Sequence, residues 1–188
     1  MIESLYAPFI DWSKAGNILI CSDTHFDDPD RYFIDKDWPD AEEHLAILNE
    51  NMGKCDTFVH LGDVGNPEYI KQIKSKHKVL IMGNHDKGAT TYKPYFDEIY
   101  KGPLFISPKI LLSHEPIYLP YVLNIHGHIH NDLFVTKHTV NYININVASD
   151  MFEYRTLNLK ALIKLGYLSY IKDIHRYSID NRVEDNEN

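Results

Sequence analysis

The chain has 188 residues, of which 44% are hydrophobic and 24% are charged, and its formal net charge is −8. This length suffices for one sizeable core and is short for two domains. The 13 Tyr and 8 Phe residues argue against disorder. A protein that holds long nucleic acid usually carries a basic stripe. The acidic balance therefore favours a small substrate and makes nucleic acid the less favoured partner.

The cysteines and the apolar runs bear on where the protein works. Cys21 and Cys55 form no CxxC pair, which argues against a thiolate zinc site. Both lie in or beside apolar runs, as reduced, buried thiols do in a cytosolic protein. The N-terminal run MIESLYAPFIDW lacks the features of a signal peptide, and no apolar run approaches the roughly 20 residues that span a bilayer. We therefore expect a cytoplasmic protein with no membrane partner.

The first half of the sequence alternates short apolar runs with helix-like segments. Apolar residues at helical spacing predict a helix over 40–52 that is closed by Gly53. A second helix is expected over Pro67–Lys76, with the proline in its first turn. The apolar runs, which are typical of buried strands, are Asn17–Ser22, Thr57–Leu61 and Lys78–Met82. This order predicts a parallel sheet with helical crossovers.

Beyond Asp86 the segments become shorter and are broken by prolines, as in a meander. A closing helix is expected over Asn158–Lys164, and the acidic tail from about Asp180 is expected to be frayed. The predicted strand segments cover residues 97–100, 104–107, 109–113, 121–125 and 139–147. We expect one catalytic domain over residues 1–168 and a C-terminal extension over residues 169–188.

Residues that can bind metal ions follow directly after the expected strands. In open α/β sheets, ligands bind outside the carboxyl ends of the strands, so these strand ends should meet at one edge. Neither core packing nor helix periodicity gives a reason for this arrangement. The segments are Asp23-Thr24-His25, Gly62-Asp63, Gly83-Asn84-His85-Asp86, Ser113-His114 and Gly127-His128-Ile129-His130.

The side chains in these segments form a mixed set of nitrogen and oxygen ligands. Such a set suits manganese, iron, zinc, nickel or cobalt better than calcium, and we expect manganese first. Two ions roughly 3.5–4 Å apart can clamp the attacking and the leaving oxygen of a phosphoryl transfer. A water held between them has its pKa drawn toward neutrality and can attack as a bridging hydroxide. The sequence therefore predicts two divalent metal ions.

These segments, in this order, resemble the five blocks of the calcineurin-like metallophosphoesterase superfamily, from about Ile18 to Asp150. The resemblance implies an α/β fold, a two-sheet sandwich with mixed sheets that is flanked by helices. It also implies two ligand sets that share one bridging carboxylate. The first metal would be held by Asp23, His25, Asp63 and His130, and the second by Asp63, Asn84, His114 and His128.

The resemblance further assigns two residues to catalysis. His85 matches the family's histidine that is not a ligand and that protonates the leaving alkoxide or steadies the transition state. Asp86 would orient His85. The opening run Ser22–Phe26 looks most like small, single-domain bacterial and phage members.

The departures from the family bear on the substrate. Its protein Ser/Thr phosphatases carry an acidic-Arg-Gly run after Gly-Asp, where this chain has Val64-Gly65-Asn66. The absent arginine, a bidentate grip on phosphate, argues against a protein phosphatase. We expect a phosphodiesterase that acts on small or nucleotide-like esters. A phosphomonoesterase or a nuclease of the same superfamily is the alternative, and an inactive metal-binding scaffold is the alternative from another class.

Other polar residues are expected to have structural or solvated roles. Asp27, Asp28 and Asp30 lack the glycine and the distal glutamate of a calcium loop, so a solvated acidic turn is expected. His60 lies in an apolar strand and is expected in the core or beside the ligands, and His126 on the other face of its segment. The histidines expected on the surface are His44, His77, His138 and His175.

Overall fold

The first of two five-stranded sheets is mostly parallel. The computed structural model describes residues 17–53, 55–130, 135–138 and 141–171. The strand order is β10-β1-β2-β3-β4, in which β1 to β4 run parallel and β10 pairs antiparallel with β1. The strands are β1 (Asn17–Cys21), β2 (Cys55–His60), β3 (Ser75–Ile81), β4 (Glu98–Tyr100) and β10 (Leu157–Asn158).

The second sheet is mixed and has the order β5-β6-β7-β9-β8. Its inner strands β6, β7 and β9 run parallel, and β5 and β8 pair antiparallel at the two edges. The strands are β5 (Leu104–Ser107), β6 (Ile110–Leu112), β7 (Leu123–His126), β8 (Val135–His138) and β9 (Tyr142–Asn146). The predicted meander is wrong here, because short runs buried on both faces carry no sign of strand direction.

Alternating side chains from both sheets meet in one apolar layer. Ile20 and Val59 of the first sheet and Ile125 and Ile145 of the second are fully buried and belong to the same cluster. Successive side chains of a strand point to opposite faces, which is why every second residue enters this layer. Each such side chain contributes roughly 1.5–3 kcal/mol on burial. Packing of this kind fixes the two sheets against each other.

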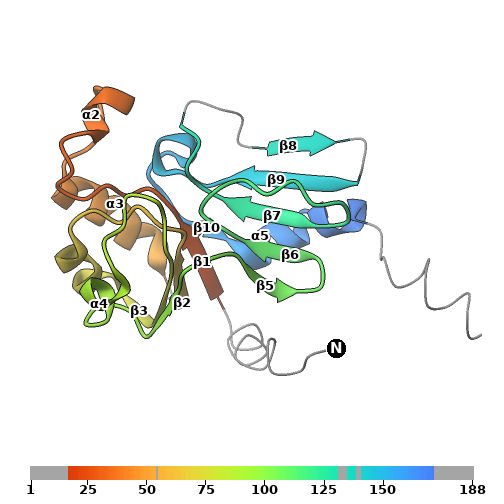
Figure 1. Cartoon of the computed structure of the whole chain (residues 1–188), viewed down its shortest axis with the longest axis horizontal. Coiled ribbons are helices and arrows are strands. Elements are labelled where there is room, and N and C mark those ends of the chain that lie inside the picture. The colour runs from red at the N-terminus through yellow and green to blue at the C-terminus, as the bar shows by residue number, and fades with distance from the viewer. Residues whose placement is uncertain (1–16, 54, 131–134, 139–140, 172–188) are drawn as a thin grey trace, which may run out of the picture.

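Helices cover the other face of the first sheet (Figure 1). Leu48 of helix α3 and Ile70 of the 3-10 helix η2 pack in one cluster with Phe58 and Leu80 of the sheet. The helices on this face are α3 (Ala41–Met52), η2 (Pro67–Gln72) and α4 (Ala89–Tyr92). Helix α5 (Leu159–Lys164) instead adds Leu159 and Leu162 to the layer between the sheets. The predicted two-sheet α/β architecture is confirmed.

The predicted ends of several elements need correction. The helix expected over 67–76 stops at Gln72, and Ser75 already pairs with Cys55 in the parallel ladder. Pairing with β2 therefore overrides helix propensity and lengthens the third strand toward its N-terminus. In contrast, Gly53 closes α3 with a φ of 48°, as expected. Strands β10 and β8 and the short helices α4 and α2 (Arg31–Ile34) were not predicted from the sequence.

Two further expectations concern the chain's ends and membranes. Most of the predicted C-terminal extension lies outside the described residues, since 172–188 are not among them. In the part of the chain that is described, no helix has the length and apolar character needed to cross a bilayer.

Candidate metal centre

The loops that follow β1, β2, β3, β6 and β7 bring the predicted ligands to one edge of the two sheets. The backbone N–H of His128 donates to Asp23 Oδ2 over 2.9 Å, which joins residues 105 positions apart. His114 Nε2 lies 3.3 Å from Asp63 Oδ2, again across the two sheets. The convergence that the strand pattern predicted is therefore present, and it unites both sheets.

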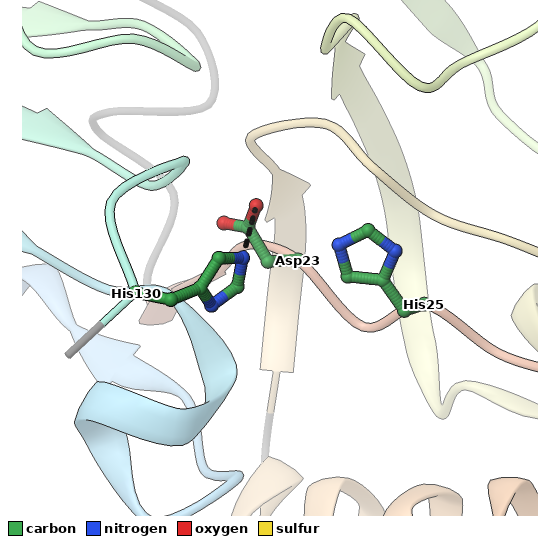
Figure 2. Close-up of side chains that lie close together, drawn as sticks. All are labelled: Asp23, His25 and His130. Atoms are coloured by element: carbon green, nitrogen blue, oxygen red, sulfur yellow. Dashed lines mark ion pairs between the residues drawn. The ribbon is translucent and has the colours of Figure 1, made fainter. Parts of the chain in front are cut away.

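One group of possible ligands consists of Asp23, His25 and His130. One ligand atom from each lies within 4.8 Å of those of the other two. Figure 2 shows the three side chains close together, with His130 Nε2 3.7 Å from Asp23 Oδ1. Asp23 and His25 are buried, at 0% and 3% exposure. These residues make up the set predicted for the first metal apart from its shared carboxylate.

A second group consists of Asp63, His114 and His128, whose ligand atoms also lie within 4.8 Å of one another. The side-chain oxygen of Asn84 is 2.8 Å from His114 Nε2 and 3.0 Å from His128 Nδ1. The two imidazole nitrogens are themselves 3.2 Å apart. All residues predicted for the second metal thus meet at one point.

Asp63 lies between the two groups. Its Oδ2 is 3.3 Å from His114 Nε2 and 4.0 Å from His25 Nε2. Its Oδ1 accepts the backbone N–H of His85 over 2.8 Å. One oxygen is therefore anchored and the other faces both groups, which is the placement that a bridging ligand needs.

The donor atoms fit divalent metal ions. Asp23 Oδ1 and His25 Nε2 are buried and have no hydrogen-bond partner among the described residues. Buried polar atoms are normally paired, so an unpaired carboxylate oxygen facing an unpaired imidazole nitrogen needs an explanation. Nitrogen and oxygen ligands bind ions such as zinc at about 2.0–2.2 Å, which places ligand atoms of one ion about 3–4.4 Å apart. A cation shared by these atoms would satisfy both.

Outer contacts turn three of the histidines toward the centre. His130 Nδ1 bonds to Asp150 Oδ1 over 2.7 Å, and His25 Nδ1 bonds to Asp28 Oδ2 over 3.1 Å. His114 Nδ1 bonds to the backbone carbonyl of Leu61 over 2.8 Å. In each case Nε2 is left to face the possible metal position, and the acceptor fixes the ring and its tautomer.

The segment after His25 is therefore more than the solvated acidic turn that the sequence suggested. Asp28 supports His25, and buried Arg31 donates from Nη1 to the His25 carbonyl over 3.2 Å. The Trp38 ring packs edge-on against His25 and His130, with centroids 6.0 and 5.9 Å apart. Sequence spacing alone does not reveal a carboxylate that bonds to the far nitrogen of a histidine ligand.

The backbone at the ligands is strained. Asp23, His25, Asp63 and His128 have φ values of 55°, 42°, 57° and 69°, in the left-handed region that favours glycine. Such residues cost about 1–3 kcal/mol each and cluster at functional sites. Close packing holds them in place: a Cβ at Gly127 would lie 2.1 Å from Asp23 Oδ2. Only glycine leaves room for that carboxylate.

Comparison with known protein families assigns the chain to one of them. The family model of the calcineurin-like phosphoesterases matches residues 16–181. The chain belongs to the calcineurin-like phosphoesterase family. The resemblance that the sequence segments indicated is therefore confirmed. The chain has the fold of this family, and its residues form two candidate metal-binding groups.

Solved structures similar to this phosphoesterase share its fold. The protein of unknown function AQ665 from Aquifex aeolicus is 27% identical, with a TM-score of 0.63 over 79% of this chain and 98% of that one. The nuclease MPE from Pseudomonas putida is 19% identical, with a TM-score of 0.50 over 76% and 87% of the two chains. A search of curated protein sequences found no match.

Charges at the centre of this phosphoesterase stabilise one another. Burial acts to lower the pKa of His114, but the hydrogen bond to Asp63 and the charge of Asp23 outweigh it and raise the pKa to about 9. Burial acts to raise the pKa of Asp63, but its contacts with His114 bring the net pKa below the ordinary value. A metal ion that binds His114 must displace its proton.

The two residues predicted for catalysis have different surroundings. His85 is exposed, and its ring centroid lies 5.6 Å from that of His25. Asp86 was expected to orient His85, but its carboxylate accepts three backbone N–H groups instead. These belong to Asp63, Val64 and Gly83, at 3.0, 3.0 and 2.8 Å. The role expected for Asp86 therefore needs correction, because both its oxygens hold the turns that carry the ligands.

His60 and His44, which lie outside the ligand set, are both buried. His60 is fully buried, accepts the Gly62 N–H at Nδ1 over 3.1 Å and contacts Thr24 Oγ1 at Nε2 over 3.0 Å, in line with a core residue beside the ligands. His44 was expected on the surface, which is wrong, because it is 1% exposed and packs against Phe26. Its position three residues after buried Ala41 on α3 was the missed signal.

Of the remaining histidines, the structure describes the side chains of His126 and His77. His126 is buried and its Nδ1 bonds to the Gly127 carbonyl over 2.8 Å. His77 is half-buried and bonds to Glu98 over 2.7 Å. The side chain of His138 and the whole of His175 lie outside the described residues.

Proposed function

We propose that this phosphoesterase is a phosphodiesterase that acts on small or nucleotide-like esters through a dinuclear metal centre. The observation that carries the proposal is the position of Asp63 Oδ2, 3.3 Å from His114 Nε2 of one group and 4.0 Å from His25 Nε2 of the other. Two bound divalent ions, manganese first among those that suit the donors, would supply a bridging hydroxide nucleophile and neutralise phosphate charge.

The chain's own residues divide into two ligand sets that meet at Asp63. The geometry supports this division, since each set forms a separate cluster of ligand atoms. Asp23, His25 and His130 would hold the first ion with Asp63, and Asn84, His114 and His128 would hold the second with Asp63. Asp28 and Asp150 keep His25 and His130 oriented through their far nitrogens.

His85 is the residue placed to move a proton. Its backbone N–H is held by Asp63 Oδ1, and its exposed ring makes no hydrogen bond within the described part of the chain. The ring is thus beside the centre without belonging to either ligand group. We assign it the protonation of the leaving alkoxide, a step in which general acids contribute roughly a hundredfold to ten-thousandfold.

Charge and sequence favour a small diester. The net charge of −8 disfavours long nucleic acid, whose binding depends on basic surfaces. The arginine that grips a phosphate monoester in the family's protein phosphatases is absent from the segment after Asp63. The Pseudomonas putida nuclease shares the fold at 19% identity, which does not select a substrate.

The test combines metal analysis with paired chromogenic esters. We expect manganese-loaded wild-type protein to hold two ions per chain and to hydrolyse bis-nitrophenyl phosphate faster than nitrophenyl phosphate. Asp63→Asn should lose at least one ion and most of the activity, while Glu50→Gln on the exposed side of α3 should change neither. A folded wild-type preparation that holds one ion would refute the dinuclear centre, and a faster monoester rate would refute the diesterase assignment.

A further inference from the structure

A cavity of about 310 Å³ opens beside the ligands of the second group. Asn84 and His114 form one of its walls. The connector 101–103, where the chain passes from β4 of the first sheet to β5 of the second, also lines the cavity. The cavity therefore lies where the chain crosses between the sheets, and one side of it is the candidate metal centre itself.

The lining combines an apolar surface with two opposite charges. Met82, Pro103 and Ile117 contribute apolar surface, and Lys101 and Glu115 are exposed at the cavity. Neither of these two charged groups forms an ion pair with another described residue. A ligand that enters with only an alkyl group could pack on the apolar surface, but it would offer no polar partner to either charged group.

We propose that this cavity is a specificity pocket that takes the nucleoside part of a nucleotide ester. Its volume lies near the lower end of the about 300–1,000 Å³ typical of small-ligand pockets, which suits one nucleoside and excludes a longer chain. A nucleobase is a flat ring that packs on apolar surface. Its carbonyl and ring-nitrogen acceptors match the donors of Lys101, and amino or sugar hydroxyl donors match the carboxylate of Glu115.

The position of the pocket supports a substrate role. A nucleoside in contact with Asn84 and His114 has its phosphate beside the second ligand group, so the reacting phosphorus and the bound ring occupy adjoining spaces. The inference rests on the proposed function for the identity of the reaction. Binding in the pocket is a separate property, and it can be measured without turnover.

The experiment compares two probes that resist hydrolysis: the thiophosphate analogue of adenosine monophosphate and inorganic thiophosphate. Calorimetric titration of the manganese-loaded protein should give at least tenfold tighter binding of the nucleotide analogue. Lys101→Ala should remove most of this difference and leave the affinity for inorganic thiophosphate unchanged. Lys160→Ala on α5 is the matched control, because β10 and β4 form opposite edges of the first sheet and α5 follows β10.

A second variant fills the pocket. Ile117→Trp keeps the backbone N–H that donates to Asn124 Oδ1 over 2.8 Å, and it should weaken only the nucleotide analogue. Equal affinity of wild-type protein for both probes, or equal weakening of both by Ile117→Trp, would overturn the pocket assignment. If chromogenic esters resist hydrolysis while the nucleotide analogue binds tenfold tighter, the pocket stands and the proposed reaction fails.

Discussion

The carboxylate of Asp86 accepts the backbone N–H of Asp63 over 3.0 Å, and so holds the turn that presents the central ligand of the site. The same carboxylate accepts the N–H groups of Val64 and Gly83. Hydrogen bonds to a charged group contribute about 1.5–3 kcal/mol each. Asp86→Asn keeps one acceptor oxygen and replaces the other by an NH₂ group. This group faces a backbone N–H and cannot accept its hydrogen bond. We expect it to lower both the free energy of unfolding and the metal content.

The matched control for Asp86→Asn is Asp40→Asn. Asp40 also accepts a backbone N–H, that of Glu43 at the start of α3, over 2.9 Å. Asparagine caps a helix about as well as aspartate, so this variant should match the wild-type protein. Urea unfolding and elemental analysis of both variants check the prediction. An Asp86→Asn protein with wild-type stability and two ions would contradict it.

The carboxylates behind the histidine ligands give a second prediction. Asp150 bonds to His130 Nδ1 and Asp28 bonds to His25 Nδ1. Loss of such a partner usually lowers metal affinity 10–100-fold. Asp150→Asn and Asp28→Asn should show this loss when a chelator competes for manganese. Asp30→Asn, an exposed residue of the same turn as Asp28, should not. If Asp28→Asn and Asp30→Asn lose manganese to the chelator equally, Asp28 does not support the ligand His25.

The ligand set was predictable because its members have a local signature. Asp23, Asp63 and His114 each follow an apolar run directly, and the parallel topology carries the ends of those runs to one edge. Asp150 has no such signature. It reaches His130 through the chain's return after β9, a tertiary contact over 20 positions that sequence spacing does not encode.

The direction of the strands in the second sheet and the role of Asp86 also depend on tertiary contacts, so they could not be predicted from the sequence. The runs that became β6, β7 and β9 are too short and too buried to show whether the chain turns back or crosses over. Asp86 follows His85 in the sequence, which suggested a pair of side chains. The tight turn instead points its carboxylate at backbone N–H groups of two loops.

Burial of two histidines predicts sensitivity to acid. Burial lowers the pKa values of His44 and His60 to about 3. The unfolded chain takes up these protons near pH 6.5, so stability falls as the pH drops from about 6.5 toward 3. His44→Phe keeps an aromatic ring against Phe26 and removes one of the two titrations. It should lose on the order of 2 kcal/mol less stability than the wild-type protein between pH 7.5 and pH 5.

Urea unfolding of metal-free protein at both pH values measures this difference. The raised pKa of His114 acts with the opposite sign, since its contribution is present below pH 6.5 and is lost as the pH rises through about 9. Because wild-type and variant proteins share His114, its effect cancels in the comparison. Equal losses in the two proteins would show that His44 takes up its proton without unfolding.

His85 separates proton transfer from metal binding. Its contact with the ligand set is made by the backbone, whose N–H donates to Asp63 Oδ1 over 2.8 Å. His85→Ala keeps that bond, so we expect two bound ions and wild-type stability. The ring is lost from its place 5.6 Å from His25, and the rate should fall. His77→Ala, in the N-terminal half of β3, is the control for removing an imidazole.

The leaving group decides whether the lost ring acted as an acid. An alkyl alkoxide needs a proton as it departs, whereas a nitrophenolate departs easily without one. The rate for an alkyl ester should therefore fall by roughly a hundredfold or more in His85→Ala, and the rate for a nitrophenyl ester should fall much less. Equal losses on both esters would assign His85 to steadying the phosphate. If His85→Ala lost a metal ion, His85 would be a metal ligand. If both rates were unchanged, another group would supply the proton.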